Sequence, residues 1–435
     1  MRFLTCVLWF LAMAAHSADF ARLEGHGGPV KGVAVSQDGK KALTASFDYA
    51  VGLWSLPDGG EIARLTGHRA AVNTAVFLPG NRAATGSDDF DIRIWDLKTG
   101  GSEVLSGHKG KVMALALSPD GRHLASAGWD GWIGVWDLDT SARMHLLQGH
   151  GSNVTDVVFA ENGSAIYSAS TDGTIRKWDV ATGAEMLRVT NHGFGVNTLL
   201  LNEAAGWLAY GGLDGGTRVL DLGTGALLAD LTLERRPILA MAARRDGAQI
   251  AVGDGEGFIM VVNTVDWSIA RDFRAAKRGP VWALAYDASG DRILAGGLDD
   301  AAYFWPLDGT IEGAMMATGE RTFLNDPRKM DNGARQFYRK CSICHTLTPD
   351  SARRAGPTLW GVFGRPAGSL PGYPYSRAME TADIIWTDET IARLFEIGPD
   401  HYTPGSKMPM QRIASEQDRR DLIGFLRDNT GANKE

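Results

Sequence analysis

The stretch LSGHKGKVMALALSPDGRHLASAGWDGWIGVWDL, residues 105–138, carries the pattern from which the architecture of most of the chain follows. Apolar residues alternate with others in segments such as VMALALS, and turn dipeptides such as DG separate these segments. Alternation between turn signals predicts short antiparallel β-strands. Three residues mark the stretch, namely His108, Asp130 and Trp136.

The same three marks recur at nearly constant spacing. The intervals between successive marker histidines are 42, 40, 42 and 42 residues. A period of about 40 to 45 residues predicts a propeller blade of four strands. The histidines are His26, His68, His108, His150 and His192; the aspartates are Asp48, Asp89, Asp130, Asp172 and Asp214; and six residues after each aspartate stand Trp54, Trp95, Trp136, Trp178 and Leu220.

Two degenerate units follow. One begins with RRPILAMAAR at 235, and the other begins with RGPVWALAYD at 278 and retains Asp299 and Trp305. The count predicts an all-β, seven-bladed propeller over residues 19–310. DFARLEGH, at the start of this range, has the pattern of a strand without a blade of its own. Its pairing with the last unit would close the ring and remove two exposed sheet edges.

Trp-Asp pairs at residues 95–96, 136–137 and 178–179 complete a pattern that resembles the WD-repeat family of β-propellers. In that family the repeated His and Asp belong to a hydrogen-bonded network inside each blade. The resemblance therefore implies a structural role, and not a catalytic one, for the marker histidines and aspartates.

A second pattern, Cys-x-x-Cys-His, lies in RKCSICHTL near the C-terminus. Cys341 and Cys344 are the only cysteines besides Cys6, and a structural zinc site would need a second pair of ligands. A thioredoxin-like dithiol would leave His345 unexplained and lacks its βαβ surroundings. Covalent attachment of one c-type haem to both thiols, with His345 on the iron, uses all three side chains.

The N-terminal residues 1–18 have the layout of a secretory signal peptide. Arg2 supplies the early positive charge, an apolar run follows, and small residues surround a cleavage point near Ala18. The apolar run is shorter than the ~20 residues that span a bilayer, and no later stretch approaches that length. The mature chain is expected in the periplasm without Cys6 and without a transmembrane segment; an uncleaved anchor is the alternative.

Two helices are predicted in the last hundred residues. Gly333 and Phe337 stand four residues apart, on one helical face suited to close packing. In ASEQDRRDLIGFLRDNT, residues 414–430, Ser415 followed three residues later by Asp418 indicates a capped helix start ahead of an apolar stripe.

Together these features resemble the class I cytochrome c family, closely its mitochondrial-type branch with soluble bacterial relatives, over roughly residues 328–430. The resemblance implies a small all-α domain, predicted over residues 327–435 and joined to the propeller by a linker over 311–326. It rests on Gly333, Phe337, the CSICH site, GPTLWGVFGR at 356–365, GYPYS at 372–376, IIW at 384–386 and YTPGSKM at 402–408.

The resemblance also implies the iron ligands. His345 corresponds to the proximal ligand, Pro357 to the residue whose carbonyl receives the imidazole N–H, and Met408 to the sixth ligand. Met410 is a rival two residues away. Phe395 departs from the family, because mitochondrial-type relatives usually have a tyrosine there whose hydroxyl reaches the methionine sulfur.

Three further residues correspond to side chains that hydrogen-bond or neutralise the haem propionates, namely Arg365, Tyr375 and Trp386. An ordinary surface arginine and core aromatic residues are the alternative. Haem iron whose axial positions are both filled has no open position for a substrate. The domain is therefore expected to pass single electrons.

The net charge of −7 is unevenly distributed. Residues 19–326 contain 27 Lys and Arg against 38 Asp and Glu, whereas residues 327–435 contain 16 against 13. The acidic propeller argues against nucleic acid as a partner, because nucleic-acid binding needs a basic surface. Solubility explains the difference most simply; the alternative is that the basic haem domain docks on its own propeller or on an acidic redox protein.

Two functions compete. In the first, the protein is an exported electron carrier whose propeller is a binding platform for a redox partner. In the second, the propeller is a periplasmic oxidoreductase with a second cofactor, a plan that resembles the propeller-plus-cytochrome nitrite reductases. A second haem or a copper site would need histidine ligands, and only His123 and His145 of the propeller lie outside the marker set. The sequence therefore favours the carrier.

Overall fold

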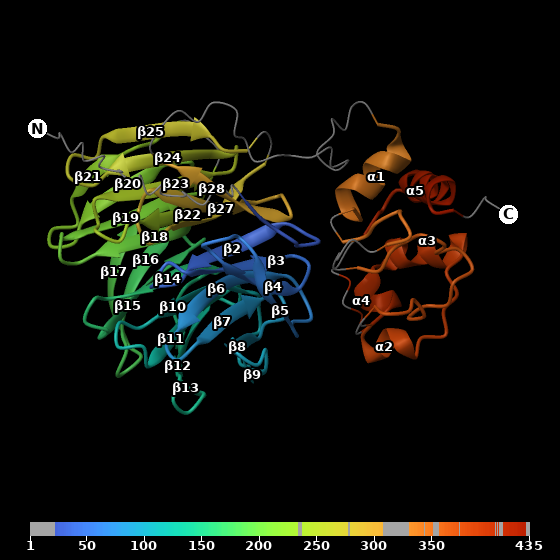
Figure 1. The fold of residues 1–435 in the computed structure, drawn as a ribbon, viewed down its shortest axis with the longest axis horizontal. Helices are drawn as coiled ribbons and strands as arrows, with labels where there is room; N and C mark the ends of the chain where they lie inside the picture. The colour runs from blue at the N-terminus through green and yellow to red at the C-terminus, as the bar shows by residue number, and fades with distance from the viewer. Residues whose placement is uncertain are drawn as a thin grey trace, which may run out of the picture.

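The structure is a computed structural model that describes residues 22–233, 237–276, 279–307, 330–342, 344–350, 356–373, 375–404, 406, 408 and 412–431. The predicted signal peptide (1–18), the predicted linker (311–326) and Met410 lie outside the described residues. Within them, the chain forms a seven-bladed β-propeller followed by a small helical region (Figure 1).

Each blade is a sheet of four antiparallel strands. The first strands of successive blades contact one another, and β26 contacts β2, so the seven sheets form a ring. The strands of blades 1 to 3 are β2 (Val30–Val35), β3 (Lys41–Ser46), β4 (Ala50–Ser55), β5 (Glu61–Thr66), β6 (Val72–Leu78), β7 (Arg82–Ser87), β8 (Ile92–Asp96), β9 (Ser102–Leu105), β10 (Val112–Leu117), β11 (His123–Gly128), β12 (Trp132–Asp137) and β13 (Ala142–Gln148).

The later blades repeat this order. Both degenerate units of the sequence form complete blades, the sixth and the seventh, and β1 is the fourth strand of the seventh. The strands are β14 (Val154–Phe159), β15 (Ala165–Ser170), β16 (Thr174–Asp179), β17 (Glu185–Asn191), β18 (Val196–Asn202), β19 (Trp207–Gly212), β20 (Thr217–Asp221), β21 (Leu227–Asp230), β22 (Ile238–Ala243), β23 (Gln249–Asp254), β24 (Phe258–Asn263), β25 (Ile269–Arg274), β26 (Val281–Tyr286), β27 (Arg292–Gly297), β28 (Ala301–Pro306) and β1 (Arg22–Glu24).

The ring closes through the pairing predicted from the sequence. β1 runs antiparallel to β28, with Leu23 opposite Ala302. Leu23 is fully buried and belongs to a hydrophobic cluster that also contains Trp54 of blade 1 and Phe304 of blade 7. One apolar side chain from the first described strand therefore packs against both the first and the last blade.

The marker residues form a hydrogen-bonded network inside four blades. In blade 2, His68 Nδ1 lies 3.0 Å from Asp89 Oδ2, and His68 Nε2 lies 2.8 Å from the Thr85 hydroxyl. The Trp95 indole N–H donates to the same hydroxyl at 2.8 Å. The predicted network is confirmed, and the hydroxyl is an additional member. Equivalent contacts use the hydroxyls of Thr44, Ser126 and Ser168.

The network is altered in later blades. In blade 5, His192 contacts Asp214 through Nε2 at 3.1 Å, and Tyr210 stands at the hydroxyl position. In blade 7, Ala295 stands ten residues before Trp305, where blades 1 to 4 have Ser or Thr. The Trp305 indole nitrogen has no hydrogen-bond partner among the residues described. Degeneration of the sequence thus removes polar contacts while the strands persist.

The C-terminal region is helical, and its last helix begins as predicted. The Ser415 hydroxyl accepts the backbone N–H of Asp418 at 3.2 Å. In the described part of the chain, no helix is long and apolar enough to cross a membrane. The helices are α1 (Asn332–Lys340), α2 (Arg377–Glu380), α3 (Asp388–Ile397), α4 (Pro399–Tyr402) and α5 (Glu416–Asn429).

Helices α1 and α5 cross at Gly333 (Figure 1). A side chain at this position would collide with the backbone oxygen of Asp421 and lie 2.8 Å from Phe425 Cβ. The rings of Phe337 and Phe425 pack with their centroids 5.5 Å apart. Asn332 Nδ2 adds a hydrogen bond to the Asp421 carboxylate at 2.7 Å. The close packing predicted for the helical face that carries Gly333 and Phe337 is therefore confirmed, and its partner is α5.

We expect Gly333→Ala and Gly424→Ala to change stability in opposite directions. At Gly333 the added methyl group overpacks against α5 and should cost about 1–3 kcal/mol of unfolding free energy. Gly424 lies in α5 with no atom within 4 Å of an added Cβ. Alanine there should stabilise the helix by up to ~1 kcal/mol. Urea unfolding followed by circular dichroism measures both changes, and shifts of the same sign would contradict the crossing.

Candidate functional site

The segment after α1 turns tightly and presents Cys344 and His345 to a pocket. Cys341 caps α1, and its backbone N–H donates to Phe337 O at 2.8 Å. The backbone N–H groups of Cys344 and His345 both donate to Cys341 O, at 3.0 and 2.9 Å. Cys341 itself is 4% exposed and packs in the core of the helical region, and this burial raises the pKa of its thiol to about 12.

His345 is held in a defined orientation. Its Nδ1 donates to the carbonyl oxygen of Pro357 at 2.7 Å, which leaves Nε2 as the ring nitrogen with an available lone pair. Burial lowers the pKa of His345, although the Pro357 contact opposes this shift, so the imidazole is neutral at neutral pH. A side chain at Gly356 would collide with the imidazole ring. The contact between His345 and Pro357 is the one implied by the family resemblance.

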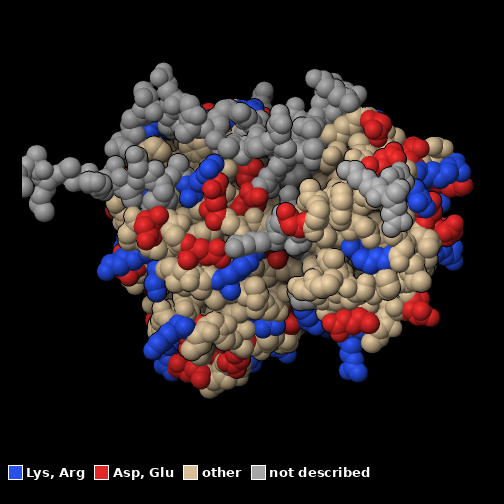
Figure 2. Space-filling view, turned by 45° about the vertical axis from the view of Figure 1, so that its right-hand side comes forward, with Lys and Arg blue, Asp and Glu red and all other residues tan. Residues whose placement is uncertain are grey.

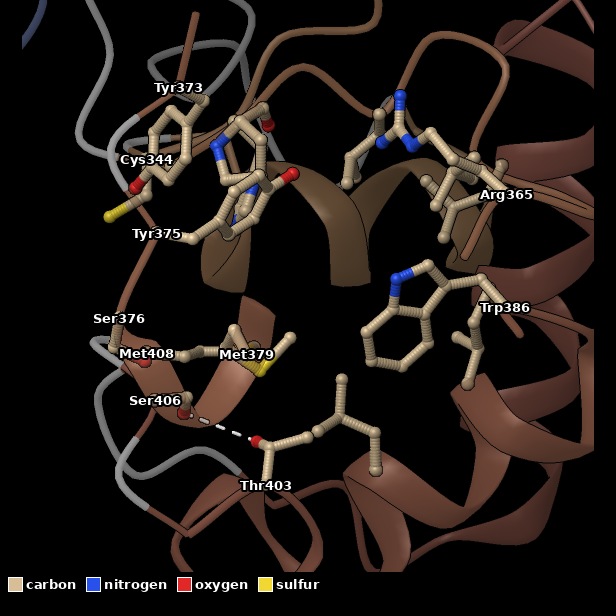
Figure 3. A pocket seen from close by; sticks show the side chains of 18 of the residues that line it. Cys344, Arg365, Tyr373, Tyr375, Ser376, Met379, Trp386, Thr403, Ser406 and Met408 are labelled. Atoms are coloured by element: carbon tan, nitrogen blue, oxygen red, sulfur yellow. Dashed lines mark hydrogen bonds between the residues drawn. The ribbon is translucent and has the colours of Figure 1, made fainter. Parts of the chain in front are cut away.

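Met408 lines the same pocket as His345. Figure 3 shows the side chains of Met408 and Met379 extending into it from the same side. The loop ahead of Met408 is held by hydrogen bonds: Thr403 Oγ1 donates to Pro399 O at 3.0 Å, and the hydroxyls of Thr403 and Ser406 lie 3.1 Å apart. Because Met410 lies outside the described residues, the choice between the two methionines stays a prediction.

The pocket has an empty volume of about 1050 Å³, part of which is open to solvent. Cys341 is not in its wall, because it packs into the core behind. The structure thus brings seven of the eight predicted site residues to one pocket: Cys344, His345, Pro357, Arg365, Tyr375, Trp386 and Met408.

Arg365 and Tyr375 point toward one another across the pocket, with Trp386 below Arg365 (Figure 3). Arg365 donates to the backbone oxygens of Thr358 at 2.7 Å and Trp360 at 2.9 Å. Burial raises the pKa of Tyr375, and the positive charge of Arg365 opposes this rise. These contacts position Arg365, and the proposed binding of propionates by the three residues stays a prediction.

The side chains of the pocket fit a haem. Nε2 of His345 and the sulfur of Met408 are the donors that bind haem iron in c-type cytochromes. The Ser376 hydroxyl lines the pocket and is buried without a hydrogen-bond partner among the described residues. Buried polar atoms are nearly always satisfied, so this hydroxyl suits a polar group of a bound molecule. The remaining wall is mostly apolar, including Leu359, Val362, Ile391, Leu394, Phe395 and Leu426.

Several wall residues were absent from the predicted set. Ser376 could have been found, because it ends the GYPYS segment that identified Tyr375. Tyr373 stacks edge-on against Tyr375, with centroids 4.7 Å apart, and belongs to the same segment. Tyr49 also lines the pocket and comes from the turn between β3 and β4 of the propeller, whereas every other wall residue lies between Cys344 and Leu426.

Comparisons with known proteins agree with both parts of the structure. The family model described as the IFT122 first beta-propeller matches residues 11–263, more than half of the chain, and the cytochrome c model matches residues 330–430. Cytochrome c of Arabidopsis thaliana is 41% identical over 115 residues, which are 26% of this chain and 99% of the relative.

Two further relatives cover the same region. Cytochrome c of Gibberella zeae is 40% identical over 98 residues, which are 22% of this chain and 92% of the relative. A cytochrome c homolog of Rickettsia felis is 33% identical over 135 residues, which are 30% of this chain and 76% of the homolog. The chain therefore belongs to the IFT122 first β-propeller family, and its C-terminal region belongs to the cytochrome c family.

Proposed function

We propose that the protein is an exported, periplasmic electron carrier that uses one covalently bound haem c, and that its propeller is a binding platform for a redox partner. The presence of Cys344, His345 and Met408 in the wall of one pocket is the observation that carries this proposal. The relationship of the helical region to cytochromes c supports the same cofactor.

In this proposal Cys341 and Cys344 would hold the haem through thioether bonds, and His345 and Met408 would ligate its iron. The haem supplies a one-electron couple. The Pro357 carbonyl fixes the imidazole orientation and raises its basicity as a ligand. Because protein side chains would supply both of these iron ligands, no coordination position would be open for a substrate.

Exposed apolar side chains support the platform role. Each blade is an antiparallel meander. The turn between its second and third strands therefore lies at the same end of the propeller as the connection that enters its first strand from the preceding blade. We call this end of the propeller, which also carries Tyr49, the haem-side face. Its exposed large apolar side chains are Phe90, Trp129, Phe194, Leu213 and Leu233. Apolar side chains mark a protein-binding surface where they are contiguous, so these residues are candidate contacts for a partner.

The surface in Figure 2 carries charges of both signs, which suits a partner whose surface also carries both. Lys and Arg lie among Asp and Glu on both the propeller and the helical region, with uncharged surface between them. Although the two domains differ in net charge, neither shows a surface of a single sign on this side of the molecule. A redox partner would be guided by local pairs of charges and by apolar contact.

The marker histidines are committed to the blades, which weighs against the oxidoreductase alternative. In blades 1 to 4 both ring nitrogens of each histidine contact side chains of the network. His145 Nε2 lies 3.1 Å from the backbone oxygen of Ala181, and His123 lies 4.0 Å from the Asp120 carboxylate. These contacts support structural and surface roles for the propeller histidines.

The full-length protein, expressed with its N-terminus in a host that exports and matures c-type cytochromes, tests the proposal. Intact mass spectrometry should show a chain that starts near residue 19 and carries one haem. A redox titration should fit a single one-electron couple, and metal analysis should find one iron per chain. A second cofactor, or turnover of a small molecule, would contradict the carrier and support the oxidoreductase.

A further inference from the structure

The turn between the second and third strands has the same geometry in successive blades. In blades 1 to 6, the residue after the marker position donates its backbone N–H to the carbonyl oxygen at the end of the second strand, at 3.1 to 3.3 Å. Blades 3 to 6 place a glycine there with positive φ, namely Gly131 (81°), Gly173 (83°), Gly215 (85°) and Gly257 (91°). Glycine adopts this left-handed conformation at little cost.

Blades 1 and 2 depart from this rule. Tyr49 has φ 69° and Phe90 has φ 73° at the equivalent turn positions. A bulky residue with positive φ is uncommon and costly to hold. Two neighbouring blades therefore hold an aromatic residue in a backbone conformation for which blades 3 to 6 use glycine.

The two aromatic residues have different surroundings. Tyr49 lines the pocket of the helical region, and burial, followed by the nearby Cys344 and Tyr373, raises the pKa of its hydroxyl. Phe90 is 43% exposed and does not line the pocket. The same positive-φ conformation thus places the Tyr49 ring in the pocket that contains Cys344 and leaves the Phe90 ring partly exposed to solvent.

The blade network fixes the position of Tyr49. Asp48 accepts hydrogen bonds from His26 Nδ1 at 2.9 Å, from the Gly27 N–H at 2.8 Å and from the Ala50 N–H at 3.0 Å. Burial opposes ionisation of Asp48, but the hydrogen bond and charge of His26, the charge of Arg64 and the Gly27 N–H outweigh it and hold the Asp48 pKa at about 2. Asp48 precedes Tyr49, and Ala50, which follows it, donates to the Asp48 carboxylate. One buried carboxylate therefore holds the backbone on both sides of the Tyr49 ring.

We propose that Tyr49 is a haem-pocket residue supplied by the propeller, and that its ring covers the pocket mouth beside Cys344. This inference rests on the haem proposed above. A ring at this place would exclude water from the haem edge and obstruct direct contact by dissolved redox reagents. Burial of a haem is one of the factors that set its potential. The propeller would then influence both the potential and the access of reagents to the haem.

Tyr49→Gly tests this proposal, with Phe90→Gly as the matched control. Both substitutions restore the glycine found in blades 3 to 6 and relieve the same backbone cost, so both should stabilise the propeller similarly. Only Tyr49→Gly should speed oxidation of the reduced full-length protein by ferricyanide, by about threefold or more, which corresponds to roughly 0.6 kcal/mol off the barrier. It should also lower the midpoint potential, whereas Tyr49→Phe should keep both wild-type values.

The outcomes separate this inference from the proposed function. If the wild-type chain carries no covalent haem, the proposed function fails. If the haem is present and Tyr49→Gly matches Phe90→Gly in oxidation rate and potential, Tyr49 does not cover the haem and this inference is overturned. A change in the stability of Tyr49→Gly without a change in oxidation rate or midpoint potential would also overturn this inference. It would show that Tyr49 affects only the turn in which it lies.

Discussion

Replacing Met408 with alanine should remove the sixth ligand from the haem iron while the covalent attachment at the two cysteines persists. The weak sulfur-to-iron absorption band at long wavelength should disappear. The midpoint potential should fall by on the order of a tenth of a volt or more, because axial ligands set haem potentials over about 0.8 V. Absorption spectroscopy and a redox titration of the full-length variant measure both effects.

Two other methionines serve as controls for this result. Met379 also extends into the pocket, so Met379→Ala removes a similar apolar volume without removing the proposed ligand. The long-wavelength band should survive in that variant. Met410→Ala should also retain it. If Met410→Ala abolishes the band and Met408→Ala does not, the ligand assignment is wrong.

Leu23→Ala should destabilise the propeller by about 2–5 kcal/mol, the usual cost of truncating a fully buried leucine. Leu23 packs between the first and last blades, so the cavity would lie at the point where the ring closes. Urea unfolding followed by tryptophan fluorescence should shift to lower midpoint, while the haem spectrum in the folded state stays unchanged.

Glu24→Ala is the matched control, since Glu24 belongs to the same strand and is exposed. Its carboxylate pairs with Arg22 on the surface at 2.7 Å, and exposed ion pairs contribute little to stability. Its expected effect is within about 0.5 kcal/mol of wild type. Equal effects of the two substitutions would show that β1 adds nothing to ring closure through its buried side chain.

The architecture of the propeller was predictable because five of its seven blades repeat the marker histidine and aspartate at nearly constant spacing. Asp89 and Trp95 could be assigned to a blade from spacing alone. The Thr85 hydroxyl was missed because Ser and Thr are common residues, and its importance appears only when strand pairing brings it between His68 and Trp95. Periodicity identifies positions, whereas hydrogen bonding across strands decides which side chains meet.

The haem pocket was predictable to the extent that its residues lie in short local motifs. His345 and Pro357 are twelve residues apart and meet as expected. Tyr49 lies almost 300 residues before Cys344, and no motif in blade 1 links them. Contact between two domains depends on the shapes and charges of folded surfaces, which a repeat pattern does not encode. The visible signal for a special role of this position was that Tyr49 stands where blades 3 to 6 have glycine.

Closure of the ring by β1 also has a consequence for the order of folding. Leu23 pairs with Ala302, so the first described strand has no partner until the last blade has been synthesised. Because this pairing joins the two ends of the propeller, closure of the ring is intrinsically slow. Since the CSICH segment is made after that blade, we expect the haem-binding segment to emerge while the propeller is still assembling. Tyr49 can take its place beside Cys344 only after both events are complete.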